Sequence, residues 1–346
     1  MFWACFLAVV VVGSVTLAVL GPPAPRHPAA SAAIAPARPA VRADQGAAAS
    51  ARGAPGDGVP SRPPSVALAA PDPALLDPAP ADGSAMGLPR IGTDGRTPMR
   101  VYAGHFDPAT KAPRIAVMIA GAGLDAAASA DAIRALPAGV TLAISPYASM
   151  AEATATAAAA RQAGHEYLIS IPMEPQGYAQ NDPGQRALLT TMSAAENAQR
   201  LDWVLSRLTG YVGGTGALGA MHGERFAEVQ DDIDPMLAAL AGRGLLYVDP
   251  RPNAMRLPFV WSRAVDAVID DPPTAASIDA RLAELERRAH DTGSALGLID
   301  AIRPVTIEHL VAWVGNLEGR GYALAPVSAV VRAPPGTSAA PSKPPQ

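Results

Sequence analysis

The chain has 346 residues, 49% of them hydrophobic, which is enough for a sizeable core in one large domain or two smaller ones. The formal net charge of −4 argues against nucleic acid as the main partner, because such a partner calls for a basic face. The single cysteine, Cys5, excludes an intramolecular disulfide and any metal site built from several cysteines.

The chain begins with a nearly continuous apolar run, Met1 to Leu20. A helix of about 20 residues spans about 30 Å, the thickness of a bilayer core, so the run predicts a membrane anchor or an export signal. No Lys or Arg precedes it, whereas a signal peptide normally starts with basic residues. Arg26, Arg38 and Arg42 follow it, which by the positive-inside rule favours a cytoplasmic side for what comes next. These residues predict membrane association and leave the orientation open.

Two segments have a composition that is typical of disorder. Residues 21–113 are dominated by Ala, Pro, Gly and Ser, and the tail 333–346 has the same character. Such segments contain few large apolar side chains to bury, so we expect a disordered linker and a disordered tail. The folded part is then residues 114–332, which is the size of one domain.

Short apolar runs alternate with helical patterns from residue 114 onward. The runs that predict strands are Ile115–Ala120, Val140–Ser145, Tyr167–Ile171, Tyr211–Gly214, Leu245–Val248, Ala264–Ile269, Ala295–Ile299 and Tyr322–Val327. The patterns between them predict helices, one of which starts at the capping box from Ser193 to Glu196. Repeated units of this kind predict parallel strands with right-handed crossovers. The sequence therefore predicts an α/β fold, a distorted parallel (β/α) barrel of about seven strands.

Polar side chains follow most of the predicted strands. The most conspicuous is Glu174, held between Met173 and Pro175 just after the third strand. In a parallel barrel the carboxyl ends of the strands meet at one face, so these side chains would line one acidic mouth. The others are Ser145, Asp249 with Arg251, Asp270 with Asp271, and Asp300, joined by His222, Glu224 and Arg225 from the loop after Tyr211.

Two interpretations of these side chains stay open on the pattern alone. Carboxylates with one histidine could bind a hard divalent cation, or act as an acid/base pair on a sugar. Alternatively, Asp and Glu at strand ends cap the helices that follow, as in many α/β proteins.

Several blocks of the sequence, taken in order, resemble a known family. They are G-H-E-Y-L-I-S-I-P-M-E-P from Gly164, N-D-P-G from Asn181, W-V-L-S-R-L-T-G-Y-V-G from Trp203, R-G-L-L-Y-V-D-P-R from Arg243, and R-G-Y-A-L-A-P-V-S-A-V from Arg320. Together they resemble the divergent polysaccharide deacetylase family over residues 114–331. The resemblance implies a distorted (β/α) barrel, usually exported, that hydrolyses N-acyl groups of envelope polysaccharide.

The chain departs from this family where a metal site would be expected. Metal-dependent deacetylases of the wider superfamily hold the ion with one Asp and two His. Here Ala120 and Gly121 replace the Asp pair after the first strand, and Ser170 replaces a histidine. Leu298-Ile-Asp300 replaces Gly-His-Pro near the end of the barrel. The family residues that carry over are Glu174, Arg225 with Phe226, Asp249 and Arg251.

Two hypotheses of function follow. The first is a hydrolase of N-acylated envelope glycan with a rearranged site. Its catalytic candidates are Glu174, Asp249 and His222, and its candidate substrate-binding residues are Arg225, Arg251, Asp270 and Asp300. The second is a catalytically silent, membrane-tethered barrel that binds glycan or an envelope enzyme.

Both hypotheses share the same expectations about partners and location. The partner is an envelope glycan or a peptidoglycan-related polysaccharide, with no nucleic acid. Because the usual metal ligands are missing, we expect no bound metal or other cofactor, although a divalent metal is chemically conceivable. The resemblance places the domain on the periplasmic side, exported or anchored through Met1 to Leu20, against the arginine count.

Overall fold

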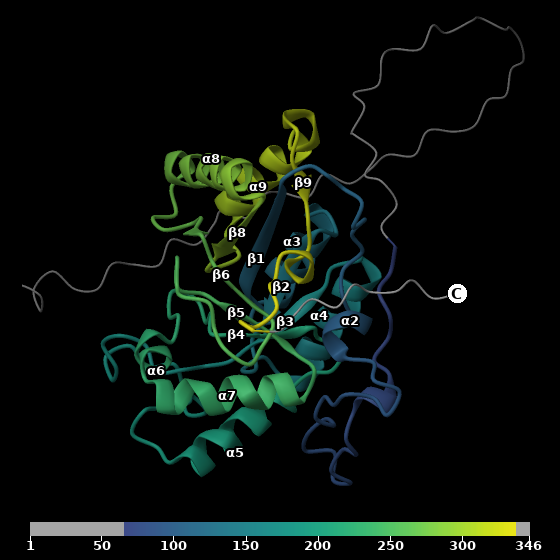
Figure 1. Ribbon diagram of the computed structural model, residues 1–346, viewed down its shortest axis with the longest axis vertical. Helices are drawn as coiled ribbons and strands as arrows, with labels where there is room; N and C mark the ends of the chain where they lie inside the picture. Colours follow the sequence, from purple (N-terminus) through teal and green to yellow (C-terminus); the bar gives the residue numbers. More distant parts are fainter. Residues whose placement is uncertain (1–65, 337–346) are drawn as a thin grey trace, which may run out of the picture. The chain divides into compact units, whose positions relative to one another are not determined.

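The computed structural model describes residues 66–336 (Figure 1). The apolar run from Met1 to Leu20, the start of the predicted linker and the tail from 337 onward lie outside the described residues. Among residues 66–336, no helix has both the length and the apolar character needed to cross a bilayer.

Strands and helices alternate along the described chain as the sequence predicts. The strands are β1 (Arg114–Ala122), β2 (Val140–Ile144), β3 (Tyr167–Ser170), β4 (Gly213–Thr215), β5 (Leu246–Asp249), β6 (Ser262–Ala264), β7 (Ala267–Val268), β8 (Ser294–Ile299) and β9 (Ala323–Leu324). The helices are α2 (Pro98–Val101), α3 (Ala126–Ala135), α4 (Met150–Gln162), α5 (Ala194–Leu205), α6 (Glu224–Glu228), α7 (Gln230–Gly242), α8 (Ala275–Thr292) and α9 (Pro304–Gly315), with short 3₁₀ turns η1 (Pro73–Leu75), η2 (Glu318–Arg320) and η3 (Val327–Ala329).

The strands pair in parallel in the order β6-β5-β4-β3-β2-β1-β8-β7, and β9 pairs with the start of β1. The two ends of this order, β6 and β7, are separated in sequence only by Val265 and Asp266. The amide of Val265 donates to the carbonyl of Asp249 on β5 at 2.9 Å, and that of Asp266 donates to Leu296 on β8 at 2.8 Å. The ends of the sheet therefore approach each other at these two residues, which supports the predicted barrel. The predicted strand Ala264–Ile269 divides here because its pairing passes from one neighbour to the other.

Alternate side chains of β1 enter two different hydrophobic layers. Ile115, Val117 and Ile119 lie in the cluster between the sheet and the helices, whereas Ala116 and Met118 lie in the cluster inside the barrel. This period of two is what a strand with both faces buried requires. The strand is consequently apolar throughout, which is why its sequence reads as an unbroken run.

Helices cover the outside of most of the sheet, with α4 against β2, α5 against β3, α7 against β5 and α8 against β8 (Figure 1). Side-chain caps mark the beginning of α4, α5 and α8. The predicted capping box at the start of α5 is present, since Ser193 accepts from the amide of Glu196 and the Glu196 carboxylate accepts in return. Between β5 and β6, by contrast, residues 250–261 contain no helix, so no helix covers the outside of the sheet at that point.

The predicted linker boundary at residue 113 is wrong for residues 66–113, which pack on the barrel. Leu75 and Tyr102 are buried and belong to the inner hydrophobic cluster. The Tyr102 hydroxyl accepts from the amide of Asp72 at 2.9 Å, so the same side chain also fixes the start of this segment. The composition is poor in large apolar residues, but a few well-placed ones are enough to hold the segment in place.

We predict that Leu75→Ala lowers the free energy of unfolding by about 2–5 kcal/mol, because it removes a fully buried side chain and leaves a cavity. The matched control is Val66→Ala in the same segment, where the side chain is 64% exposed and the expected change is within about 0.5 kcal/mol. Urea unfolding of the full-length protein measures both. Equal small effects of the two substitutions would show that residues 66–113 contribute no core.

Candidate active site

The carboxyl ends of the strands bring buried polar side chains together at one end of the barrel. Ser145, Ser170, Thr215, Asp270 and Asp300 follow or end β2, β3, β4, β7 and β8, and all are at most 7% exposed. Parallel strands place these residues at one end of the barrel. Ser145, Asp270 and Asp300 belong to the set named from the sequence, whereas Ser170 and Thr215 do not. Asp271, the neighbour of Asp270, is exposed and lies outside this group.

His222 reaches this mouth from the loop that follows β4. Its Nε2 lies 2.8 Å from Oδ1 of Asp300, and its Nδ1 lies 3.8 Å from Oε1 of Glu224. The loop turns back through paired backbone bonds between Leu218 and Met221 and ends at Gly223, which has φ 66°. A Cβ at Gly223 would lie 2.7 Å from the Cβ of Met173, so a larger residue would displace the turn that holds His222.

The two carboxylates beside His222 control its charge. Burial alone would lower the pKa of His222, but the hydrogen bond to Asp300 and the charges of Asp300, Glu224 and Asp249 outweigh burial and raise the pKa above its usual 6.5. His222 is therefore held toward its charged form, in which both ring nitrogens donate.

Asp270 binds the backbone of Asp300 and so helps to position the pair of His222 and Asp300. Its Oδ1 accepts from the backbone amide of Asp300 at 2.8 Å, and its Oδ2 is paired with Arg303 at the start of α9. Burial, together with the nearby charge of Asp300, raises the pKa of Asp270 despite these hydrogen bonds and the charge of Arg303. The sequence predicts Asp270 and Asp300 at the mouth but gives no signal for Arg303 beyond its closeness to a strand end.

Asp249 is occupied by its own neighbour in the chain. Arg251 forms a bidentate ion pair with it, donating from Nε to Oδ1 at 3.0 Å and from Nη2 to Oδ2 at 2.7 Å. The backbone amide of Arg251 also donates to Oδ1. The Arg251 side chain is 22% exposed and that of Asp249 is 2% exposed. Of the two, only Arg251 has much contact with solvent.

Glu174 binds a neighbouring turn. Its Oε2 accepts from the amide of Thr190 at 2.7 Å and from the Thr190 hydroxyl at 2.8 Å. Its backbone bonds to Leu188 and Phe226, and its Oε1 lies 4.0 Å from Nε of the exposed Arg225. The structure thus joins Glu174 and Arg225 to each other, whereas His222, Asp300 and Asp270 form a connected group without them. In these contacts Glu174 holds the turn at Thr190 and caps no helix.

Comparison with known proteins identifies the barrel. The family model described as divergent polysaccharide deacetylase matches residues 117–331, and a crystal structure of an uncharacterized protein from Agrobacterium tumefaciens C58 is 32% identical, with a TM-score of 0.65 over 71% of this chain and 100% of that one. The chain belongs to the divergent polysaccharide deacetylase family. This confirms the resemblance seen in the sequence and assigns the protein a carbohydrate deacetylase-like character.

More distant matches include a peptidoglycan deacetylase domain and a carbohydrate esterase. The catalytic domain of a peptidoglycan N-acetylglucosamine deacetylase from Eubacterium rectale ATCC 33656 is 13% identical over 65% of this chain and 91% of that one, with a TM-score of 0.39. A family 4 carbohydrate esterase from Streptomyces lividans, in complex with acetate, is 13% identical over 65% of this chain and 100% of that one, also at 0.39. No curated protein matches the chain.

The residues at the mouth of this chain do not fit the metal site that metal-dependent polysaccharide deacetylases use. Across residues 66–336, no three His, Cys, Asp or Glu side chains come together in a way that could hold an ion. At the first strand the buried Ala120 offers no ligand atom, and on β3 the Ser170 hydroxyl is buried without a hydrogen-bond partner in the described chain. A catalytic zinc site needs three protein ligands plus an open position, so the donor set falls short.

The pair of His222 and Asp300 makes stability depend on pH. Because the pKa of folded His222 is raised, the pair's contribution is complete below the unfolded value of about 6.5 and is lost as pH rises through the folded value. We therefore expect the difference in thermal midpoint between wild type and His222→Gln to be largest near pH 6 and to shrink at higher pH.

His309→Gln is the control for this pH series, since its pair with Asp279 lies on the outer helices and the Asp279 side chain is 62% exposed. An exposed pair contributes about 0–1 kcal/mol, so this variant should follow wild type closely. A difference for His222→Gln that grows with pH would contradict the assigned charge.

Proposed function

We propose that the mouth of this barrel binds an N-acylated polysaccharide of the cell envelope and does not hydrolyse it by the metal-dependent route. The observation that carries the proposal is the ion pair of His222 and Asp300, which stands at the mouth of a polysaccharide deacetylase barrel where the usual ligand set is incomplete. Family membership supports a polysaccharide as the ligand.

The mouth offers hydrogen-bonding groups that suit a sugar. His222, Glu224, Arg251 and Arg303 are between 12% and 41% exposed at their side chains and come from three different loops. Charged His and Arg donate, and Glu accepts, so sugar hydroxyls and an N-acyl carbonyl both find partners here. A few convergent polar groups of this kind are typical of small-molecule sites.

Hydrolysis of an amide needs an activated water, and the residues of the mouth are poorly arranged to supply one. A general base must be able to take a proton near the working pH. The raised pKa of His222 favours its charged form over the neutral form that a base needs, and its Nε2 is already bound to Asp300. Asp249 is bound at both oxygens by Arg251. Each catalytic candidate is already satisfied within the protein, which favours binding over catalysis.

A second function, hydrolysis with a rearranged site, is favoured by one feature of the same pair. A histidine fixed by a carboxylate can donate a proton to a leaving amine, so His222 could act as a general acid. Asp300 would then be a positioning residue that keeps His222 charged. This function still requires a base from outside the pair.

Binding and acetate release by the full-length protein distinguish the two functions. We expect retention on chitin and on peptidoglycan, little retention on cellulose, which lacks N-acyl groups, and no acetate release with or without added zinc. Asp300→Asn should weaken retention about tenfold or more, because a charged hydrogen bond is worth about 1.5–3 kcal/mol. The matched control, Asp279→Asn, alters an outer His–Asp pair and should leave retention unchanged.

Other outcomes of this experiment have definite meanings. Acetate release that is abolished in His222→Gln would establish the hydrolase instead. Equal retention on chitin and cellulose, or equal retention by Asp300→Asn and wild type, would remove the proposed binding site.

We further propose that the barrel works outside the cytoplasm, exported or anchored through the apolar run from Met1 to Leu20. An envelope polysaccharide is accessible only there, and a run of this length can cross a bilayer. Alkaline phosphatase fused after Gln346 should be active in cells, and a reporter that works only in the cytoplasm should be silent. The reverse pattern would overturn both the location and the envelope ligand.

A further inference from the structure

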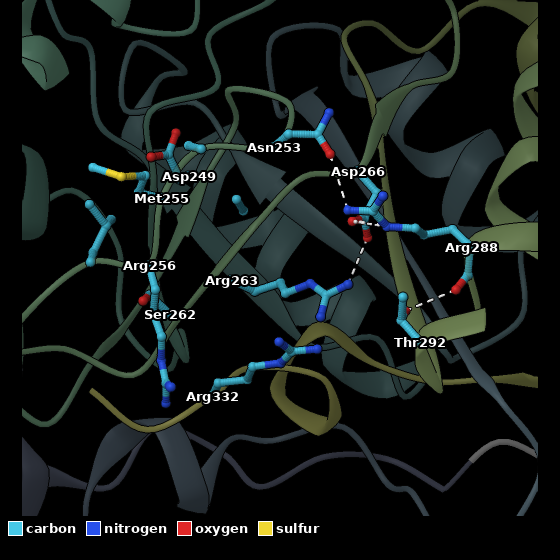
Figure 2. A pocket seen from close by; sticks show the side chains of 13 residues that line it. Asp249, Asn253, Met255, Arg256, Ser262, Arg263, Asp266, Arg288, Thr292 and Arg332 are labelled. Carbon is cyan, nitrogen blue, oxygen red and sulfur yellow. Dashed lines mark hydrogen bonds and ion pairs between the residues drawn. The ribbon is translucent and has the colours of Figure 1, made fainter. Parts of the chain in front are cut away.

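The bare wall of the barrel beside β6 holds a pocket that is distinct from the ion pair at the mouth. Because residues 250–261 form no helix, the space between β6 and α8 is left open to a volume of 320 Å³ (Figure 2). The pocket is bounded by this loop, by β6, by the end of α8 and by Arg332, whose backbone pairs with Ser262. We call it the lateral pocket.

Arginines dominate the charge of the lateral pocket. Its lining includes the four arginines Arg256, Arg263, Arg288 and Arg332 and the two aspartates Asp249 and Asp266. Asp249 is already neutralised by Arg251, so one carboxylate faces four guanidinium groups. The excess of positive charge stands out in a chain with a net charge of −4.

Asp266 holds two of these arginines in fixed positions. Its Oδ2 accepts from Nη2 of Arg263 at 2.7 Å, and its Oδ1 lies 3.2 Å from Nε of Arg288. Arg263 also donates to the hydroxyl and the carbonyl of Ser294, and its side chain is only 8% exposed. A buried, fully oriented guanidinium is costly to build and gives a rigid donor surface.

Arg332 lies beside Arg263, and the two guanidinium groups point toward the same part of the pocket (Figure 2). In the described chain its side chain has no hydrogen bond or ion pair. Burial, with the charges of Arg263, Arg256 and Arg288, lowers the pKa of Arg332. A cation among cations is destabilising by itself, and a bound anion would relieve the repulsion.

We propose that the lateral pocket binds a small ligand through a carboxylate or phosphate group held between Arg263, Arg288 and Arg332. The planar fork of arginine matches both groups, and the volume lies at the lower end of the range for small-molecule sites, which suits one sugar unit. Arg256 is engaged with the carbonyl of Ala333 and serves as the rim. The site is separate from the proposed polysaccharide function and does not depend on it.

Calorimetric titration of the full-length protein tests the site with glucose 6-phosphate, glucuronate and glucose as probes. We expect at least one of the two charged sugars to bind and glucose not to bind. Arg332→Gln and Arg288→Gln should each weaken that binding about tenfold or more, the loss expected for one charged hydrogen bond. Which charged sugar binds more tightly decides between phosphate and carboxylate.

The matched control is Arg287→Gln, which removes the neighbouring charge on the same helix but does not line the pocket. It should bind the charged sugar like wild type. Without ligand, Arg332→Gln should keep or slightly raise the thermal midpoint, which guards against misfolding as the cause of lost binding. Binding of glucose as tight as that of the charged sugars, no binding of either charged sugar, or equal losses in all three variants would overturn the proposal.

Discussion

The buried carboxylate of Glu166 closes the amino end of the barrel, and the functional end depends on this closure. Its oxygens accept from the amide of Gly104 at 2.8 Å, from the hydroxyl of Thr141 at 3.0 Å and from the amide and hydroxyl of Ser328. A buried carboxylate without partners would be very costly, so this one requires all three segments to be in place. It thereby joins the segment before β1 and the segment after β9 to the strands.

Closing one end leaves the other free to vary. At the carboxyl end, the loop after β4 brings His222 to Asp300, 78 positions later in the sequence. The same freedom allows the loop between β5 and β6 to replace a helix. The mouth and the lateral pocket are thus both built by loops on the strand framework, which is how one fold supports different functions.

Local patterns explain which parts of this fold could be predicted from sequence. The runs around Ile115 and Leu168 are apolar on both faces, and Ser193 with Glu196 caps a helix through contacts three residues apart. Leu75 packs against residues that are distant in the sequence, so the local composition around it wrongly predicts a disordered linker. The contact between His222 and Asp300 depends on the geometry of the loop after β4. The exposure of Arg332 to the lateral pocket depends on the absence of a helix between β5 and β6. Neither feature produces a periodic pattern in the sequence.

The charge distribution separates the two candidate sites physically. At the mouth, Asp300 and Glu224 lie beside His222, and Asp249 and Asp270 are paired with Arg251 and Arg303. The charges are therefore largely balanced, which suits a neutral hydrogen-bonding ligand such as an N-acylated sugar. In the lateral pocket, the excess of arginine repels cations and attracts anions. An anionic group that binds beside β6 finds no comparable excess of positive charge at the mouth. The two sites therefore select different chemical groups, so a polysaccharide that engaged both would need a neutral N-acylated unit and an anionic unit.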